Sequence, residues 1–193
     1  MKNNLTEKDI ENLNKWAEKY DIEELKIKDK EKIFNLEELH ISNDNLTELP
    51  KEIGILTNLK SLDIRTNNLT KLPKKIGNLI NLEELHITSH NLTELPKEIG
   101  NLTNLKSLII RCNNLKELPK EIFNLINLEK LRIISNNLEI SPDGIEKLIN
   151  LEKLDININI INENFNFKSL PIEEIGKLNN LKEFDISIRK EEK

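Results

Sequence analysis

The sequence is poor in cysteine and in aromatic side chains. Among its 193 residues Cys112 is the only cysteine, and aromatic residues make up 4%. One cysteine excludes a disulfide within the chain, and small secreted domains usually depend on such bridges, so we expect a reducing, cytoplasmic compartment. Because bulky rings are scarce, the core has to be built from leucine and isoleucine.

Long apolar runs and an excess of basic charge are missing as well. No stretch approaches the ~18–20 apolar residues that span a bilayer, and the first residues lack the apolar run of a signal peptide. The formal net charge of -5 argues against a general nucleic-acid binder. We therefore expect neither a membrane nor a nucleic acid as partner, with signal-less export as an alternative to a cytoplasmic location.

The sequence does contain one unit that returns every 23 residues. The segment NLEELHISNDNLTELPKEIGILT begins at Asn35, and related segments begin at Asn58, Asn81, Asn104, Asn127 and Asn150. The copies share the pattern LxxLxLxxNxLxxLPxxIxxLxN, and in two of them Asp44 and His90 stand in place of its asparagine. Shorter copies lie at residues 21–27 and 180–186.

The residues of one copy predict a strand followed by a tight return. Leu39 and Ile41 alternate with a polar residue, which is typical of a short strand that buries one face. Pro50 has no N–H and therefore ends the strand ladder, while Ile53 and Leu56 are spaced as on a helical or 3₁₀ turn. Since no single copy can bury its leucine face alone, successive copies must stack.

This pattern resembles the leucine-rich repeat family, in particular the 23-residue repeats of Ras-group scaffolds and of many bacterial repeat proteins. The resemblance covers nearly everything from Asp21 onward. It implies an α/β fold, a curved solenoid with parallel strands on the concave face and helical or 3₁₀ turns on the convex face. It also implies scaffold or adaptor work through binding of a partner protein, with no enzymatic activity, no catalytic residue, no cofactor and no metal.

The N-terminal segment departs from the repeat. Thr6 and Asp9 are spaced as a capping box, with aspartate in place of glutamate. One helical face then carries Ile10, Leu13, Ala17 and Tyr20, with Trp16 at its border. We expect residues 1–20 to form a capping helix that seals the first repeat, with a binding patch at Trp16 and Tyr20 as the alternative.

The solenoid is expected to fill residues 21–193, with an insertion at about 162–169. This insertion carries Phe165 and Phe167 in a chain with few other rings. The two rings either cover the C-terminal core or contact a partner as an insertion-loop site. The last strand leaves an exposed edge, so an edge-strand dimer stands as the alternative to the expected monomer.

The outward strand positions form the candidate binding surface. Neighbouring strands lie ~4.8 Å apart, so outward residues of successive copies fall side by side. The nine residues that we predict to bind a partner protein on this concave face are His40, Asp63, Arg65, His86, Ile109, Arg111, Arg132, Ile134 and Asp155. We expect Ile158 and Ile188 to face outward on or beside the same sheet.

Arginine is scarce, and its placement supports this prediction. The four arginines of the chain are Arg65, Arg111, Arg132 and Arg189. Three of them project from the predicted concave face, where a planar guanidinium suits recognition better than a lysine ammonium. Asp63 beside Arg65 and Asp155 beside Arg132 also allow internal pairs. A solvated face of mixed charge is the alternative.

Several patterns have structural interpretations. His40 and His86 flank Asp63, but two strands separate the histidines by ~9–10 Å, which is too far to share a metal ion readily. Cys112 lacks a positioned base, so we expect a packed thiol.

A recurring asparagine predicts an internal polar row. We expect inward amides that bond buried backbone groups at Asn67, Asn113, Asn136 and Asn159, with Asp44 and His90 as substitutes.

Two other functions stay open from the sequence. One is a microbial, host-directed effector or virulence-type repeat protein. The other is an enzyme with an unrecognised site.

Overall fold

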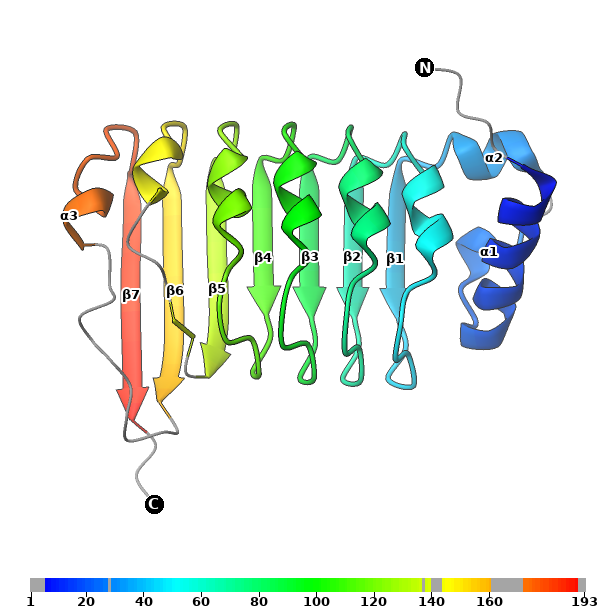
Figure 1. The fold of residues 1–193 in the computed structure, drawn as a ribbon, viewed down its shortest axis with the longest axis horizontal. Helices are drawn as coiled ribbons and strands as arrows, with labels where there is room; N and C mark the ends of the chain where they lie inside the picture. The colour runs from blue at the N-terminus through cyan, green and yellow to red at the C-terminus, as the bar shows by residue number, and fades with distance from the viewer. Residues whose placement is uncertain (1–5, 28, 137, 140–143, 161–171, 191–193) are drawn as a thin grey trace.

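The computed structural model describes residues 6–27, 29–136, 138–139, 144–160 and 172–190. The chain winds as a stack in which each copy adds one strand to a single sheet and one short turn to the opposite layer (Figure 1). All strand pairs are parallel and follow chain order, from β1 to β7. The predicted solenoid with strands on one side and 3₁₀ turns on the other is therefore confirmed.

The elements have the following bounds. The strands are β1 Glu38–Ser42, β2 Ser61–Arg65, β3 Glu84–Thr88, β4 Ser107–Arg111, β5 Lys130–Asn136, β6 Lys153–Ile160 and β7 Glu183–Lys190. The 3₁₀ turns are η1 Glu23–Leu25, η2 Lys51–Ile55, η3 Lys74–Asn78, η4 Lys97–Asn101, η5 Lys120–Asn124 and η6 Ile145–Lys147. The α-helices are α1 Glu7–Tyr20, α2 Lys30–Phe34 and α3 Ile172–Ile175. No helix in these ranges is both long enough and apolar enough to cross a membrane.

Equivalent residues of successive copies stack directly on one another. Leu39 is paired with Leu62 and Ile41 with Ile64, and none of these four side chains is more than 2% exposed. A slip of one residue would turn this whole apolar set to the outside, so burial fixes the register of the sheet. The alternation predicted for the strands is thereby confirmed.

A proline precedes each of the regular turns η2 to η5. These residues are Pro50, Pro73, Pro96 and Pro119, with φ between -70° and -63°. The pyrrolidine ring holds φ near this value, and the missing N–H falls where the ladder has already ended. The Leu-Pro step thus converts strand into return segment, as the sequence predicts.

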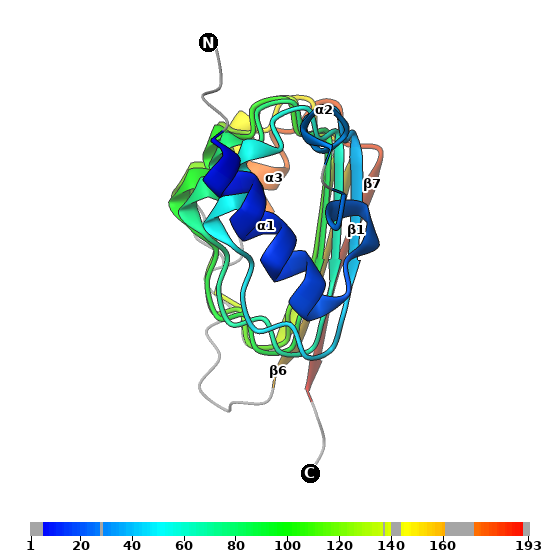
Figure 2. The same ribbon diagram turned by 90° about the vertical axis from the view of Figure 1, so that its right-hand side faces the viewer.

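Glycines let the turns approach one another closely. A Cβ added at Gly54 or Gly77 would lie 2.4 or 2.3 Å from the carbonyl oxygen of Lys75 or Glu98 in the next turn. Without a Cβ at these positions, the turns of successive copies can pack against each other at this short distance. The sheet is uncurled (Figures 1 and 2), and we therefore call its outer surface the sheet face instead of the concave face.

A row of small polar side chains lies inside the stack, next to the strands. It contains Thr66, Ser89, Cys112 and Ser135, all buried. The three hydroxyls donate to backbone carbonyls 20 residues earlier, at 2.8 to 3.0 Å. The inward position predicted for Asn67 and His90 is wrong, because both are exposed. Strand alternation continues past the second buried strand position, which turns the preceding residue inward and the asparagine outward.

The helix α1 covers the N-terminal end of the stack. The predicted capping box is present, with Thr6 Oγ1 accepting from Asp9 N at 3.2 Å and Asp9 Oδ2 accepting from Thr6 N at 3.1 Å. The buried face consists of Ile10, Leu13, Trp16, Ala17 and Tyr20. Trp16 Nε1 also donates to the carbonyl oxygen of Glu48 at 3.1 Å. Figure 2 shows α1 crossing the opening between the sheet and the turns.

The C-terminal end has no comparable cover among the described residues. β7 is the last strand of the sheet, and its inward Phe184 is 49% exposed. The equivalent Leu154 of β6 is 1% exposed, because β7 packs beside it. The short helix α3 lies beside η6 on the turn side of this end (Figure 1). One end of the stack is thus closed by its own helix and the other shows part of its core.

Candidate protein-binding surface

The outward side chains of the seven strands form one continuous surface, the sheet face. In-register pairing lines up one row as His40, Asp63, His86, Ile109, Arg132 and Asp155. A second row lines up Arg65, Thr88, Arg111 and Ile134. The structure places all nine residues predicted to bind a partner on this face, and their role in binding stays a prediction.

At the N-terminal side of the sheet face, four residues form what we call the Asp63 cluster: His40, Asp63, Arg65 and His86. The Asp63 carboxylate lies 3.2 Å from His40 Nδ1 and 3.4 Å from His86 Nδ1. Arg65 donates to both oxygens of Asp63, from Nη2 at 2.8 Å and from Nε at 3.2 Å. The predicted internal Asp63–Arg65 pair is confirmed, so the charge of Arg65 is already neutralised within the chain.

His86 is the less exposed of the two histidines in this cluster, at 23% against 51% for His40. Burial lowers the pKa of His86, and the positive charges of Arg111 and Arg65 lower it further, while Asp63 opposes the shift. Thr88 Oγ1 lies 3.4 Å from His86 Nε2. The neutral imidazole is therefore favoured in the fold. Among the described residues, no group of three His, Cys, Asp or Glu side chains could hold a metal ion.

The middle of the sheet face has a different character. Arg111 at the end of β4 is exposed and forms no ion pair with any described residue. Its neighbours in the row are Thr88 and Ile134, and Ile109 lies two residues earlier on the same strand. The guanidinium N–H groups of Arg111 are therefore available to donate hydrogen bonds to a ligand, and the two partly exposed isoleucines beside it supply apolar contact area.

Towards the C-terminal side, Arg132 is held by an acidic neighbour. Its Nε lies 2.9 Å from Asp155 Oδ2, as the sequence predicts, although this nitrogen forms no well-aligned hydrogen bond. The pair lines a shallow hollow of about 470 Å³ over β5 to β7, together with Lys130, Lys153 and Asp185. Arg65 and Arg132 are therefore internally paired, and Arg111 between them is not.

Two apolar residues expected on this surface lie elsewhere. Ile158 is buried, at 1% exposure, and Ile188, paired with it across the sheet, packs partly buried against the core. β6 and β7 are eight residues long, so strand alternation continues and turns these even-numbered positions inward. Phe165 and Phe167 lie outside the described residues.

Cys112 is packed inside the stack, as expected. It is fully buried, and burial raises the pKa of its thiol to about 12. The thiolate is the nucleophilic form of cysteine, so this side chain is not poised for covalent chemistry.

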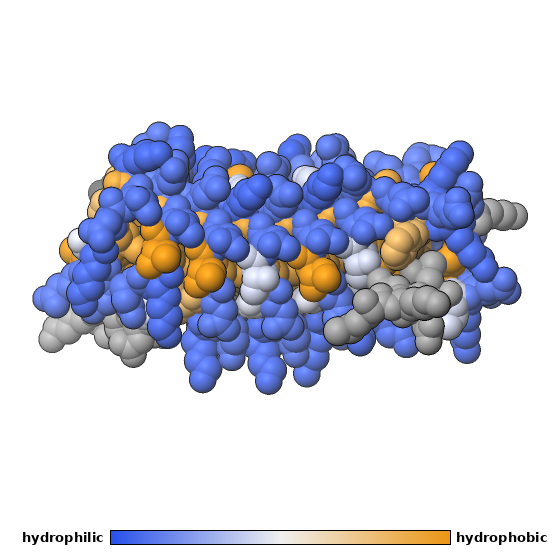
Figure 3. Space-filling view, turned by 90° about the horizontal axis from the view of Figure 1, so that it is seen from above, coloured by the Kyte–Doolittle hydropathy of each residue, from blue (hydrophilic) through white to orange (hydrophobic). Residues whose placement is uncertain are grey.

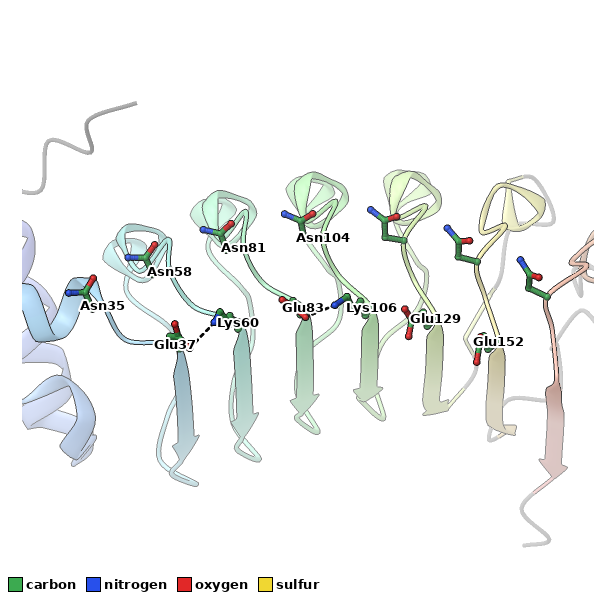
Figure 4. A pocket seen from close by; sticks show the side chains of 13 residues that line it. Asn35, Glu37, Asn58, Lys60, Asn81, Glu83, Asn104, Lys106, Glu129 and Glu152 are labelled. Atoms are coloured by element: carbon green, nitrogen blue, oxygen red, sulfur yellow. Dashed lines mark hydrogen bonds and ion pairs between the residues drawn. The ribbon is translucent and has the colours of Figure 1, made fainter.

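A second surface, which we call the edge groove, runs along the edge where each turn leads into its strand. It is an open groove of about 840 Å³, lined by asparagine amides on one side and by glutamates and lysines on the other (Figure 4). The asparagines are Asn35, Asn58, Asn81, Asn104, Asn127, Asn150 and Asn180. From Asn58 onward, each Nδ2 donates to a backbone carbonyl of the preceding copy at 2.7 to 3.0 Å.

Ion pairs between copies neutralise most of the charge in this groove. Glu37 pairs with Lys60 at 2.8 Å and Glu83 with Lys106 at 2.7 Å (Figure 4), and Glu152 pairs with Lys182 at 2.8 Å. Exposed pairs of this kind contribute only about 0–1 kcal/mol each. Sequence reasoning missed this ladder, although the repeated asparagine that begins each copy was its signal.

Apolar side chains are also exposed along this edge. Viewed from above, they alternate with polar ones across the stack (Figure 3). Ile80, Ile126 and Ile149, which follow the turns η3, η5 and η6, are 54%, 50% and 60% exposed. Their carbonyl oxygens accept the asparagine amides of the next copy. The edge groove thus has a structural role that accounts for its asparagines.

Comparison with protein families identifies one match. The family described as "Leucine-rich repeat region" matches residues 13–91 and 74–193. No curated protein sequence matches the chain.

Several solved structures are similar. A leucine-rich repeat protein of Leptospira interrogans is 28% identical, with a TM-score of 0.50, over 85% of this chain and 53% of that one. The ectodomain of the Arabidopsis thaliana receptor kinase GASSHO1/SCHENGEN3, in complex with Casparian strip integrity factor 2, is 25% identical, with a TM-score of 0.57, over 74% of this chain and 17% of that one. The repeat domain of the type III effector XopL, 22% identical with a TM-score of 0.62 over 98% and 73%, shares the fold. This chain spans about half of the Leptospira protein and a smaller part of the plant ectodomain.

Proposed function

This chain belongs to the leucine-rich repeat family, and on that premise we propose that it is a protein-binding module that works as a scaffold or adaptor through its sheet face. The proposed binding surface is centred on Arg111 and consists of His40, Asp63, Arg65, His86, Ile109, Arg111, Arg132, Ile134 and Asp155. The repeats supply a surface and no chemistry of their own.

The free guanidinium of Arg111 is the observation that carries this proposal. Arg65 and Arg132 already face carboxylates of their own chain, at 2.8 and 2.9 Å, whereas Arg111 does not. Arginine binds carboxylates through two parallel hydrogen bonds, and arginine beside apolar side chains is typical of the residues that dominate protein interfaces. The partner therefore places a carboxylate over Arg111 and an apolar side chain between Ile109 and Ile134.

The similar plant receptors support a polypeptide ligand. One is in complex with Casparian strip integrity factor 2, and another, the peptide hormone receptor RGFR1, is in complex with RGF2. Both share 25% of their residues with this chain over the matched region. A catalytic role has less support, because Cys112 is buried with a raised pKa. We place the binding function in the cytoplasm, where a chain with one cysteine needs no disulfide.

Affinity capture from a lysate of the source organism, followed by binding measurements with the identified partner, tests the proposal. Reversing the charge with Arg111→Glu should weaken binding by more than about tenfold, since it replaces attraction by repulsion at a contact worth at least ~1.4 kcal/mol.

Lys97→Glu is the matched control. Lys97 is exposed on η4, in the turn that precedes β4, and the substitution makes the same change in charge on the opposite layer. The proposal predicts unchanged binding for this variant. Binding that survives Arg111→Glu, alone and combined with Arg132→Glu, contradicts the assignment of the sheet face.

A further inference from the structure

β7 ends the sheet with an edge that no described strand pairs with. Exposed edges are usually blunted by charged side chains, by proline, by a bulge, by a covering segment or by being very short. β7 has eight residues, no proline and continuous pairing to β6 on its other side. Its inward side chains are Phe184, Ile186 and Ile188, of which Phe184 is 49% exposed. This edge therefore offers both a row of backbone hydrogen-bonding groups and apolar side chains.

The sequence of β7 is complementary to itself when two copies meet antiparallel. A twofold axis perpendicular to the sheet, midway between the two copies of Ile186, places each residue opposite the one equally far on the other side of Ile186. On the inner face, Ile186 then meets Ile186, and Phe184 meets Ile188 twice. This arrangement covers Phe184 with an aliphatic side chain, the kind of cross-strand pair that stabilises sheets.

The outer face is complementary in the same register. Glu183 lies opposite Arg189 twice, and Asp185 lies opposite Ser187 twice. Arg189 is exposed and forms no ion pair with a described residue of its own chain. Glu183 pairs with Lys153 of β6 at 2.7 Å, on the side away from the free edge, but both side chains are exposed. Such a pair contributes only about 0–1 kcal/mol, so the carboxylate can be shared with Arg189 of a second copy. Opposite charges that face each other across two strands favour the pairing.

We propose that two copies of this chain form a twofold dimer through antiparallel pairing of β7 with β7, centred on Ile186. The two seven-stranded sheets would then join into one continuous sheet. The interface is isologous, as in most symmetric dimers, and leaves both sheet faces open on the same side. This inference goes beyond the proposed function and does not depend on it, because it uses the edge of the sheet and leaves Arg111 free.

Disulfide trapping tests the register directly. In an antiparallel pair, opposed Cα atoms lie about 4.5–5.5 Å apart, which is within reach of a disulfide. Ile186→Cys should therefore give a covalent dimer on a non-reducing gel after mild oxidation. Ile188→Cys is the matched control, because its two copies lie roughly 13 Å apart along the paired strands and should not crosslink. Cys112 gives no background, since it is fully buried.

A charge swap tests the same interface without a cysteine. Glu183→Arg and Arg189→Glu should each weaken self-association by about tenfold in sedimentation equilibrium, because each places like charges together twice. Mixing the two variants should restore the dimer, since the arginine introduced in one copy then faces the glutamate introduced in the other. This rescue also shows that both variants are folded. Glu38→Arg, at the equivalent outward position of β1, should leave self-association unchanged.

The crosslinking and charge-swap experiments together test the β7–β7 dimer. Dimer trapping at Ile186 alone, together with restored association in the mixture, supports it. A wild-type chain that stays monomeric at every concentration overturns it, as does efficient crosslinking at Ile188 or at Ser187 with none at Ile186. Restored association in the mixture would be hard to reconcile with any dimer that does not oppose residues 183 and 189.

Discussion

The two ends of the stack differ in how well their apolar interior is covered. At the N-terminal end, α1 lies across the opening and buries Leu13 completely, whereas at the C-terminal end Phe184 remains 49% exposed. Both ends terminate the same apolar interior, which open solenoids must cover. Among the described residues, a helix of the chain closes the N-terminal end, and no comparable element covers the C-terminal end.

Removal of a core side chain at each end should reveal the contrast most strongly. Leu13→Ala should lower the free energy of unfolding by about 3 kcal/mol, because it opens a cavity under α1. Phe184→Ala should cost about 1 kcal/mol in dilute solution, since half of that ring already meets solvent. Urea denaturation of both variants gives the two values. Equal losses would show that the C-terminal end is covered in the single chain.

A methyl group added at a glycine should lower stability in the interior of the turn layer and leave it nearly unchanged at the C-terminal end. Gly77→Ala should destabilise by about 2 kcal/mol, because its Cβ would lie 2.3 Å from the carbonyl oxygen of Glu98. Gly176→Ala should be neutral or slightly stabilising, since its nearest neighbour would be 3.4 Å away. Thermal melting compares the two. A tolerated Gly77→Ala would contradict close packing of the turns.

Loss of the helix cap should weaken the closed end by a smaller amount. Thr6→Ala removes the acceptor for Asp9 N and should lower stability by about 1 kcal/mol. Thr6→Ser keeps the hydroxyl and should retain most of the stability. Circular dichroism during urea unfolding measures both, and an equal loss in the serine variant would contradict the capping role.

Titration of His86, which lies far from both ends of the stack, should have the smallest effect on stability. The pKa of His86 is lowered in the fold, so the unfolded chain binds its proton more readily as pH falls below the ordinary value near 6.5. Stability should therefore decrease as pH falls from about 7.5 to 5.5. His86→Gln should remove part of this slope in urea titrations at the two pH values, and an unchanged slope would exclude His86 as its source.

The repeat made much of this structure predictable. The spacing of Leu39 and Ile41 set the strands, Pro50 set the turn, and the in-register rows placed Asp63 between His40 and His86. Internal pairing of Arg65 and Arg132 also followed from these rows. Such inferences succeed because a fixed period determines which residues of neighbouring copies touch.

Other features depend on details that the period does not contain. The strands β6 and β7 extend to eight residues, which turned Ile158 and Ile188 inward. The inward polar position is held by Ser89 and Ser135 instead of the residue that follows each. The uncurled sheet and the close contact of Gly77 with Glu98 in the next turn are seen only in the three-dimensional packing.

Hydroxyl-radical footprinting of the complex with the captured partner tests the central claim, that the sheet face around Arg111 binds a protein, most directly. The account predicts that oxidation of Ile109 and Ile134 falls in the complex. Ile126 and Ile149, which are exposed along the edge groove, should react as in the free chain. Protection of Ile126 and Ile149, with Ile109 and Ile134 unchanged, would contradict the claim and move the binding surface to the edge groove.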